Sequence, residues 1–187
     1  MATARNIAVI VGSLRKGSFS RQAALALAKV APEGMTLTIV EIRDLPLYDQ
    51  DLDAEHMPPA AWVAFRDAIR PMDAALFVTP EYNRSVPGVL KNAIDVGSRP
   101  YGQSVWSRKP AAVMSTSLGA IGGFGANHHL RQSLVFLDMP VLQQPEAYVG
   151  SAGTLFGPEG DFVSDATQTF FKSFIDAFAA WIERVAA

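Results

Sequence analysis

The chain has 187 residues, of which 49% are hydrophobic and 18% are charged, and its net charge is −2. This length suits one domain with a substantial buried core, so we expect a single domain over residues 1–187. The small negative charge does not favour nucleic acid or an anionic membrane surface as a partner. The lack of cysteine excludes disulfides, thiolate nucleophiles and thiolate metal sites.

The N-terminal segment does not have the charged and then apolar pattern of a signal peptide. No apolar run approaches the roughly 18 residues that a membrane span requires. The sequence therefore predicts a cytoplasmic protein with no membrane partner.

Short apolar runs alternate with helical patterns along the chain. The predicted strands cover 6–11, 37–40, 74–79 and 110–115, and a short fifth strand begins at 140–142. The predicted helices cover 22–30, 59–69, 87–96, 125–137 and 165–185, and long loops are expected at 45–59 and 147–162. This alternation indicates an α/β fold with a parallel sheet covered on both faces. We expect a flavodoxin-like three-layer α/β/α sandwich with five strands in the order 2-1-3-4-5.

The loop at 12–20, after the first predicted strand, has the composition of a phosphate site. Glycines at 12 and 17 let the backbone approach a ligand closely, and a helix follows whose N-terminus favours an anion. The loop contains no carboxylate. Its candidate phosphate ligands are the hydroxyls and cations of Ser13, Arg15, Lys16, Ser18 and Ser20.

The spacing of this loop argues against two other phosphate motifs. Lys-Gly-Ser at 16–18 has the wrong order for a Walker A loop, and the loop lacks the G-x-G-x-x-G pattern that binds a dinucleotide pyrophosphate. A single phosphate monoester fits better. The alternative interpretation is an ordinary polar turn between a strand and a helix, since glycine and serine are common in turns.

Two further loops are expected at the same edge of the sheet, because the carboxyl ends of parallel strands lie together. The loop at 79–88 is stiffened by two prolines, and Tyr82 and Asn83 offer an aromatic edge and amide hydrogen bonds. The loop at 115–125 is rich in glycine and serine. Together they suit a flat ring such as isoalloxazine, although the last loop alone is equally well interpreted as a turn before a helix.

These loops resemble those of the NAD(P)H-dependent FMN reductases, in particular the bacterial chromate, quinone and ferric reductase branch. The resemblance covers nearly the whole chain. It is carried by Gly-Ser-Leu-Arg-Lys-Gly-Ser at 12–18, Thr-Pro-Glu-Tyr-Asn at 79–83, Ser-Val-Pro-Gly at 85–88, Leu-Lys-Asn-Ala-Ile-Asp at 90–95 and His-Leu-Arg-Gln at 129–132. It implies a flavodoxin-like fold, tightly bound FMN, and NADPH or NADH as the hydride donor.

The resemblance also implies which residues bind the cofactor. The phosphate would be held by Ser13, Arg15, Ser18 and Ser20. The ring and ribityl chain would be lined by Pro80, Glu81, Tyr82, Asn83 and Arg84, with Ser117 and Gly119 along the other edge. Arg84 stands where many members have Tyr or Ser, so the resemblance assigns no acceptor preference at this position.

The implied reaction is the two-electron, ping-pong reduction of quinones and other small acceptors, including chromate and ferric complexes. Hydride transfer through FMN needs no catalytic side chain, and a homodimer or homotetramer is implied. Arg99 and Tyr101 are candidate contacts for an anionic acceptor or for the phosphate of the nicotinamide cofactor, or else a surface arginine and a turn tyrosine. Two alternative functions are a flavodoxin-like electron carrier without reductase activity and a reductase that supplies free reduced FMN to a partner.

Three other groups of residues are interpreted as structural. The histidines at 56, 128 and 129 do not have metal-ligand spacing, so we expect no metal site. Asp49, Asp51 and Asp53 lack the glycine and glutamate of a calcium loop, and we expect them in a solvated loop. The aromatic residues of 165–185 have helical spacing and are expected to pack in the core, with an interface as the alternative.

Overall fold

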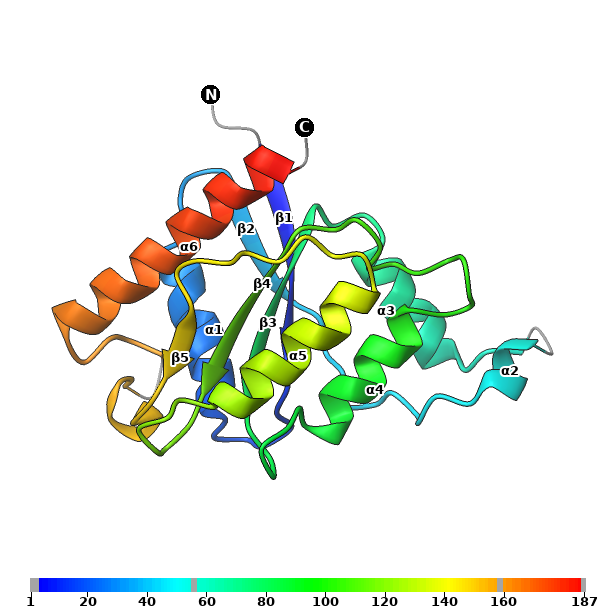
Figure 1. The fold of residues 1–187 in the computed structure, drawn as a ribbon, viewed down its shortest axis with the longest axis horizontal. Coiled ribbons are helices and arrows are strands. Elements are labelled where there is room, and N and C mark those ends of the chain that lie inside the picture. The colour runs from blue at the N-terminus through cyan, green and yellow to red at the C-terminus, as the bar shows by residue number, and fades with distance from the viewer. Residues whose placement is uncertain (1–3, 55–56, 158–159, 186–187) are drawn as a thin grey trace.

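The computed structural model describes residues 4–54, 57–157 and 160–185. Its centre is a parallel five-stranded sheet in the order β2-β1-β3-β4-β5 (Figure 1). The strands are β1 (Arg5–Val11), β2 (Met35–Ile39), β3 (Ala74–Pro80), β4 (Ala111–Thr116) and β5 (Ala147–Val149). The helices are α1 (Phe19–Lys29), α2 (Gln50–Ala54), α3 (Ala60–Ile69), α4 (Gly88–Gly97), α5 (Phe124–Phe136) and α6 (Asp165–Val185), with a 3₁₀ turn η1 (Ala152–Thr154). This order confirms the predicted three-layer sandwich.

The central strands are apolar on both faces because helices cover both sides. In β1, Ile7 and Val9 belong to the apolar cluster under α1 and α6, whereas Ala8 and Ile10 belong to the cluster under α3, α4 and α5. All four side chains are fully buried. A strand between two helical layers has no solvated face, which explains the uninterrupted apolar runs in the sequence.

Helix α6 closes one face of the sheet with its aromatic residues, as predicted. Phe171, Phe174 and Phe178 are fully buried beside α1 and the sheet. Among the described residues, no helix combines the length and apolar character that crossing a bilayer would require.

The fifth strand lies further along the chain than predicted. Val141 makes only an isolated bridge to Ala111, and the ladder with β4 runs from Ala147 to Val149. Pro140 is the first residue of the predicted strand and Pro145 follows it, and neither has an N–H to donate to a ladder. The strand therefore forms only after the second proline.

The segment predicted as a long loop at 45–59 contains helix α2, which a buried ion pair fixes to α3. Arg66 donates to both carboxylate oxygens of Asp53, at 2.9 and 2.7 Å, and its Nε donates to the Val96 carbonyl at 2.9 Å. The two side chains are only 7% and 5% exposed. The guanidinium lowers the pKa of Asp53 below the ordinary carboxyl value. The expectation of a solvated loop was therefore wrong for Asp53.

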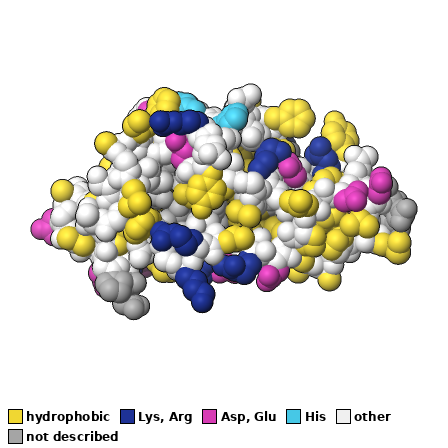
Figure 2. Space-filling view, turned by 90° about the horizontal axis from the view of Figure 1, so that it is seen from below, with side chains coloured by type: hydrophobic (Ala, Val, Ile, Leu, Met, Phe, Trp, Pro, Cys, Tyr) yellow, Lys and Arg dark blue, Asp and Glu magenta, His cyan; other side chains and the backbone are white. Residues whose placement is uncertain are grey.

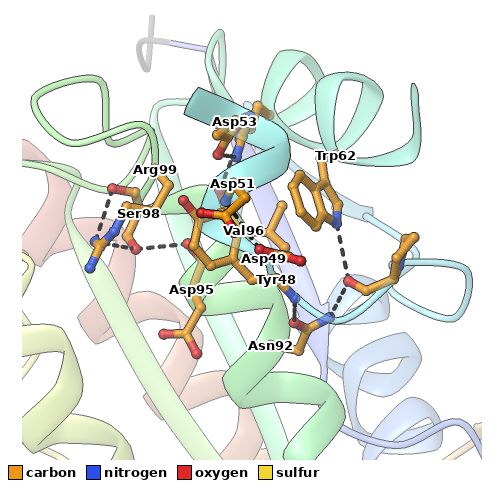
Figure 3. A network of polar contacts seen from close by, with 12 residues as sticks. Tyr48, Asp49, Asp51, Asp53, Trp62, Asn92, Asp95, Val96, Ser98 and Arg99 are labelled. Atoms are coloured by element: carbon orange, nitrogen blue, oxygen red, sulfur yellow. Dashed lines mark hydrogen bonds and ion pairs between the residues drawn. The ribbon is translucent and has the colours of Figure 1, made fainter. Parts of the chain in front are cut away.

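Asn92 on α4 holds the chain just before α2. Its Oδ1 accepts from the Tyr48 N–H at 2.9 Å, and its Nδ2 donates to the Pro46 carbonyl at 2.9 Å (Figure 3). Trp62 Nε1 donates to the same carbonyl at 3.0 Å. These bonds satisfy the buried amide and indole groups and fasten this connection to the helical layer.

The buried ion pair gives a direct test of how this flank is held. We expect Asp53→Ala to lower the free energy of unfolding by about 3–5 kcal/mol, because Arg66 would remain buried without its partner. The pair contributes fully above the ordinary carboxyl pKa and is lost as pH falls through the lowered pKa of Asp53. Urea unfolding at neutral pH measures the change.

Asp51→Ala is the matched control, because Asp51 lies on the same short helix with an exposed side chain. It should change the unfolding free energy by no more than about 0.5 kcal/mol. Equal losses in the two variants would show that the Asp53–Arg66 pair does not secure α2.

Candidate functional site

Three loops leave the same edge of the sheet, where the strand order reverses between β1 and β3. The two strands pair in parallel up to Val11 and Val78, so the connection after β1 and the connection after β3 start side by side. The loop after β4 starts next to them. Figure 2 looks onto this edge and shows a group of Lys and Arg side chains in its lower middle, with further cations spread above. Ligands of such sheets bind at this position.

Glycine is required where the first loop begins. The Gly12 N–H donates to the Val78 carbonyl at 2.9 Å. A Cβ at this position would lie 2.8 Å from Thr79 Oγ1. Only glycine lets the start of the loop lie this close to β3, so Gly12 fixes how the first two loops meet.

Helix α1 begins at this loop and presents its N-terminus to the edge. Ser18 is the N-cap, and its Oγ accepts from the Arg21 N–H at 3.2 Å. The N–H groups of Phe19 and Ser20 occupy the first two positions of the helix, where intrahelical acceptors are lacking. These two groups and the helix dipole make the end of α1 suitable for a phosphate.

Positive charge surrounds the same loop. The Arg15 guanidinium lies over the Phe19 ring, 4.8 Å from its centroid. Arg43 donates to the Leu14 carbonyl. Arg43 was missed in the sequence interpretation because it follows β2, and only the pairing of β2 with β1 brings it beside the loop.

These cations have few acidic neighbours. Arg21 is paired with Glu41, the two charged groups being 2.7 Å apart. In the described part of the chain, Arg15, Lys16 and Arg43 form no ion pair. The loop therefore carries an uncompensated positive charge that would favour a doubly charged phosphate.

The predicted serine ligands do not all face the edge with their hydroxyls. Ser20 is 1% exposed, and its Oγ lies 2.8 Å from Thr116 Oγ1. The helix begins at Phe19, earlier than the predicted start at 22, and this turns the Ser20 hydroxyl toward β4. Ser13 is half-buried, and its Oγ accepts from the Arg15 N–H at 3.4 Å. Ser20 thus offers its backbone N–H to the edge, and not its hydroxyl.

The loop after β3 contains a tight turn. Tyr82 and Ser85 exchange backbone hydrogen bonds of 3.1 and 3.0 Å. Asn83 and Arg84 between them have φ angles of 51° and 63°. Such a turn suits Asn at its first central position but normally has Gly at the second. Tyr82 is 56% exposed, so its ring is available to a ligand.

The residues before this turn are engaged within the protein. Glu81 is 14% exposed; its Oε2 accepts from the Ala126 N–H at 3.0 Å, and its Oε1 lies 3.3 Å from an Arg84 guanidinium nitrogen. The Pro80 carbonyl accepts from Thr79 Oγ1 at 2.8 Å. Glu81 is predicted to line the cofactor, and the structure shows that its carboxylate is directed at α5.

The loop after β4 forms the third side of the edge. The Ser117 N–H donates to the Val149 carbonyl at 2.9 Å, and Ser117 Oγ accepts from the Gly119 N–H at 3.0 Å. Leu118 and Ile121 are 69% and 58% exposed. A Cβ on Gly122 would lie 2.5 Å from the Tyr148 backbone, so this glycine keeps the loop against β5. The third loop thus presents exposed apolar side chains.

The two adjacent histidines diverge, as expected for neighbours on a helix. His128 Nε2 lies 2.8 Å from Tyr148 Oη, and His129 Nδ1 lies 2.8 Å from Ser85 Oγ. Burial raises the pKa of Tyr148 to about 12, so its hydroxyl is protonated at neutral pH. Within the residues that the structure describes, no three His, Asp or Glu side chains could jointly hold a metal ion.

Arg99 and Tyr101, the predicted acceptor contacts, lie away from this edge. They follow the C-terminal end of α4, whereas the loop after β3 leads into its N-terminal end, and ten helical residues span about 15 Å. They line a cavity of about 830 Å³ together with Tyr48 and Arg70. Figure 3 shows Arg99 beside Ser98, to whose Oγ it donates at 3.0 Å.

The edge, and not that flank cavity, has the chemistry that FMN requires. The N-terminus of α1, with Arg15, Lys16 and Arg43 around it, suits the single phosphate of FMN. The exposed Tyr82 ring, the turn backbone and the apolar border of the third loop suit a flat ring with polar edges. The flank cavity also has cations, but among the described residues that line it, none belongs to the N-terminus of a helix that directly follows β1, β3 or β4. The residues present therefore fit FMN at the edge.

Comparisons with known proteins identify the family to which this chain belongs. The family model of the NADPH-dependent FMN reductases matches residues 5–154. A quinone reductase from Pseudomonas putida is 62% identical over 183 residues, which cover 98% of this chain and 97% of that protein. A 2-hydroxy-1,4-benzoquinone reductase from a Burkholderia species is 48% identical, with 96% and 97% covered.

A solved structure extends the similarity to three dimensions. FerB from Paracoccus denitrificans, described as a flavoenzyme NAD(P)H:(acceptor) oxidoreductase, superposes with a TM-score of 0.91 at 40% identity. The match covers 97% of this chain and 99% of FerB. The match to the family model spans all five strands and the three loops of the edge, so this chain belongs to the NADPH-dependent FMN reductase family.

Proposed function

We propose that this chain is an FMN-containing enzyme that uses NADPH or NADH to reduce quinones. The observation that carries the proposal is the meeting of three loops at one sheet edge, with a cationic helix N-terminus beside an open, partly apolar border. The names of the relatives, a quinone reductase and a hydroxybenzoquinone reductase, support quinones as the acceptor class.

The first loop binds the phosphate in this proposal. The N–H groups of Phe19 and Ser20 donate to its oxygens, and Ser13 and Ser18 line the loop. Arg15 and its neighbouring cations balance the phosphate charge. Each charge-assisted hydrogen bond of this kind contributes about 1.5–3 kcal/mol.

The second and third loops hold the ring. Tyr82 and the backbone of Asn83 and Arg84 face one edge, and Ser117 and Gly119 face the other. FMN held between these loops would supply two-electron transfer from the nicotinamide to the acceptor. The protein orients the reactants and needs no side chain as acid or base for the hydride step.

An open edge lets donor and acceptor use the same place in turn. The exposed Tyr82, Leu118 and Ile121 give a flat acceptor an apolar surface to lie against. This arrangement predicts ping-pong kinetics. We further propose chromate and ferric complexes as secondary acceptors, since they need only access to the reduced cofactor and a cationic rim.

Anaerobic reduction tests the proposal. The purified protein, loaded with FMN, should lose its yellow absorbance when NADPH or NADH is added and regain it when benzoquinone follows. Failure to bleach would contradict a reductase and leave an electron carrier. Bleaching followed by passage of the flavin through a filter would instead support a supplier of free reduced FMN.

Arg15→Ala tests the phosphate assignment. Removing one charge-assisted contact should weaken FMN binding about tenfold to a hundredfold. Riboflavin, which lacks the phosphate, should bind the variant and the wild type equally well. Quenching of flavin fluorescence measures both affinities.

Arg70→Ala is the matched control, because Arg70 lines the flank cavity and not the edge. It should leave both affinities unchanged. If Arg15→Ala weakens riboflavin and FMN alike, or if Arg70→Ala weakens FMN, the phosphate does not lie at the first loop.

We also propose that the protein, with 1–187 as one domain, forms a homodimer or homotetramer in the cytoplasm, where NADPH and NADH are supplied. Val135 and Phe136 at the end of α5 are 74% and 80% exposed, and such apolar surface favours self-association. Sedimentation should give at least twice the chain mass of 20.1 kDa. A mass equal to that of one chain would contradict an oligomer.

A further inference from the structure

The turn from Tyr82 to Ser85 borders the proposed ring site, but it has little support of its own. Its own backbone bonds are the two between Tyr82 and Ser85. Asn83 and Arg84 both adopt positive φ, which is unfavourable for a side chain such as that of Arg84. Turns of this kind usually join two paired strands, whereas this one is followed by Pro87 and α4. Its position must therefore be fixed by contacts from elsewhere.

The first such contact comes from Glu81, directly before the turn. Its Oε2 accepts the Ala126 N–H at 3.0 Å, in the first turn of α5. The N-cap of α5 is Gly123, which has no side chain to accept these N–H groups. A carboxylate also interacts favourably with the dipole at a helix N-terminus. Glu81 therefore caps α5 from a different loop.

Gly125 makes room for this contact. A Cβ at Gly125 would lie 2.9 Å from Glu81 Oε2 and 2.9 Å from the Arg84 carbonyl oxygen. The backbone of α5 and the turn thus touch directly at this point. Any side chain at position 125 would displace the turn from the helix.

The second contact comes from His129, at the other end of the turn. Its Nδ1 lies 2.8 Å from Ser85 Oγ. Ala126 and His129 are three residues apart and share one face of α5. Both ends of the turn are therefore fastened to the same face of one helix.

We propose that Glu81 and His129 are positioning residues that clamp the turn onto α5 and thereby set the distance between the second and third loops. Helix α5 starts at the end of the third loop, so a turn fixed to α5 is also fixed relative to Ser117 and Gly119. The inference rests on the proposed function, because these two loops are the ones that would border the ring. It assigns the Glu81 carboxylate to α5, and not to the cofactor.

A clamp that acts on the ring site, and not on the phosphate site, can be recognised from the affinities for riboflavin and FMN. Riboflavin and FMN share the ring and differ in the phosphate. Loosening the clamp should weaken both to the same extent, whereas a change in the first loop should affect FMN alone. The ratio of the two affinities therefore locates the effect of a substitution.

The test uses Glu81→Ala, Glu81→Gln and His129→Ala in the full chain. Glu81→Ala should weaken riboflavin and FMN binding equally, by about tenfold, and His129→Ala by several-fold. Glu81→Gln should recover most of the affinity, because its amide oxygen still accepts the Ala126 N–H. In flavin-free protein, hydrogen exchange at the Ala126 amide should be about tenfold faster in Glu81→Ala than in the wild type.

Glu183→Ala is the matched control, since Glu183 is an exposed partner of Arg5 on α6. It should leave both affinities and the Ala126 exchange unchanged. If Glu81→Ala does not fold, the riboflavin and FMN affinities of Glu81→Gln and His129→Ala still test the clamp.

Faster exchange at Ala126 with unchanged riboflavin affinity would overturn the positioning role, and so would a loss confined to FMN. Equal losses in the alanine and glutamine variants would show that the negative charge of Glu81, and not its hydrogen bond to Ala126, carries the effect, which would overturn the hydrogen-bonded clamp. A wild-type protein that binds no flavin would refute the proposed function, while unchanged Ala126 exchange in Glu81→Ala would refute the clamp alone.

Discussion

The parallel pairing of β1 with β3 is the constraint on which the site depends. It places the start of the first loop beside the end of β3, where the Gly12 N–H reaches the Val78 carbonyl at 2.9 Å. Because the strand order reverses here, α1 and α4 lie on opposite faces of the sheet (Figure 1). The crevice between the two connections is therefore open to a ligand. A side chain at position 12 would force these strands apart and move the helix N-terminus away from the second loop.

Two groups of charged residues differ in whether their charges are paired within the protein. On the flank, Asp53 and Arg66 are almost fully buried and satisfy each other, as buried charges must. At the edge, Arg15, Lys16 and Arg43 lie around one loop and have no carboxylate partner within the described residues. Repulsion among exposed cations opposes folding slightly, and an anionic ligand removes it. The flank has a cavity of about 830 Å³, but the chemistry of the residues favours the edge.

The sequence predicted the sheet order, both helical layers and the three loops. Strands buried on both faces are apolar throughout, and helices buried on one face have apolar residues at helical spacing, so both can be recognised from neighbouring residues alone. The features it missed depend on contacts between distant residues. Asp53 is buried because the fold places Arg66 beside it. The Ser20 hydroxyl faces β4 because α1 already begins at Phe19. The resemblance predicts that Glu81 lines the cofactor, but it gives no sign of the hydrogen bond to Ala126, which lies 45 positions further along the chain. Arg43 reaches the first loop only through the pairing of β2 with β1.

A crystal structure of the protein with bound FMN tests the central claim most directly. The account predicts the phosphate at the N-terminus of α1, with oxygens on the N–H groups of Phe19 and Ser20 and a guanidinium from Arg15. It predicts the ring between the turn at Tyr82–Ser85 and the loop at Ser117 and Gly119, with the Glu81 carboxylate still on α5. FMN bound in the flank cavity beside Arg70 and Arg99, or a ring contacted by the Glu81 carboxylate, would contradict it.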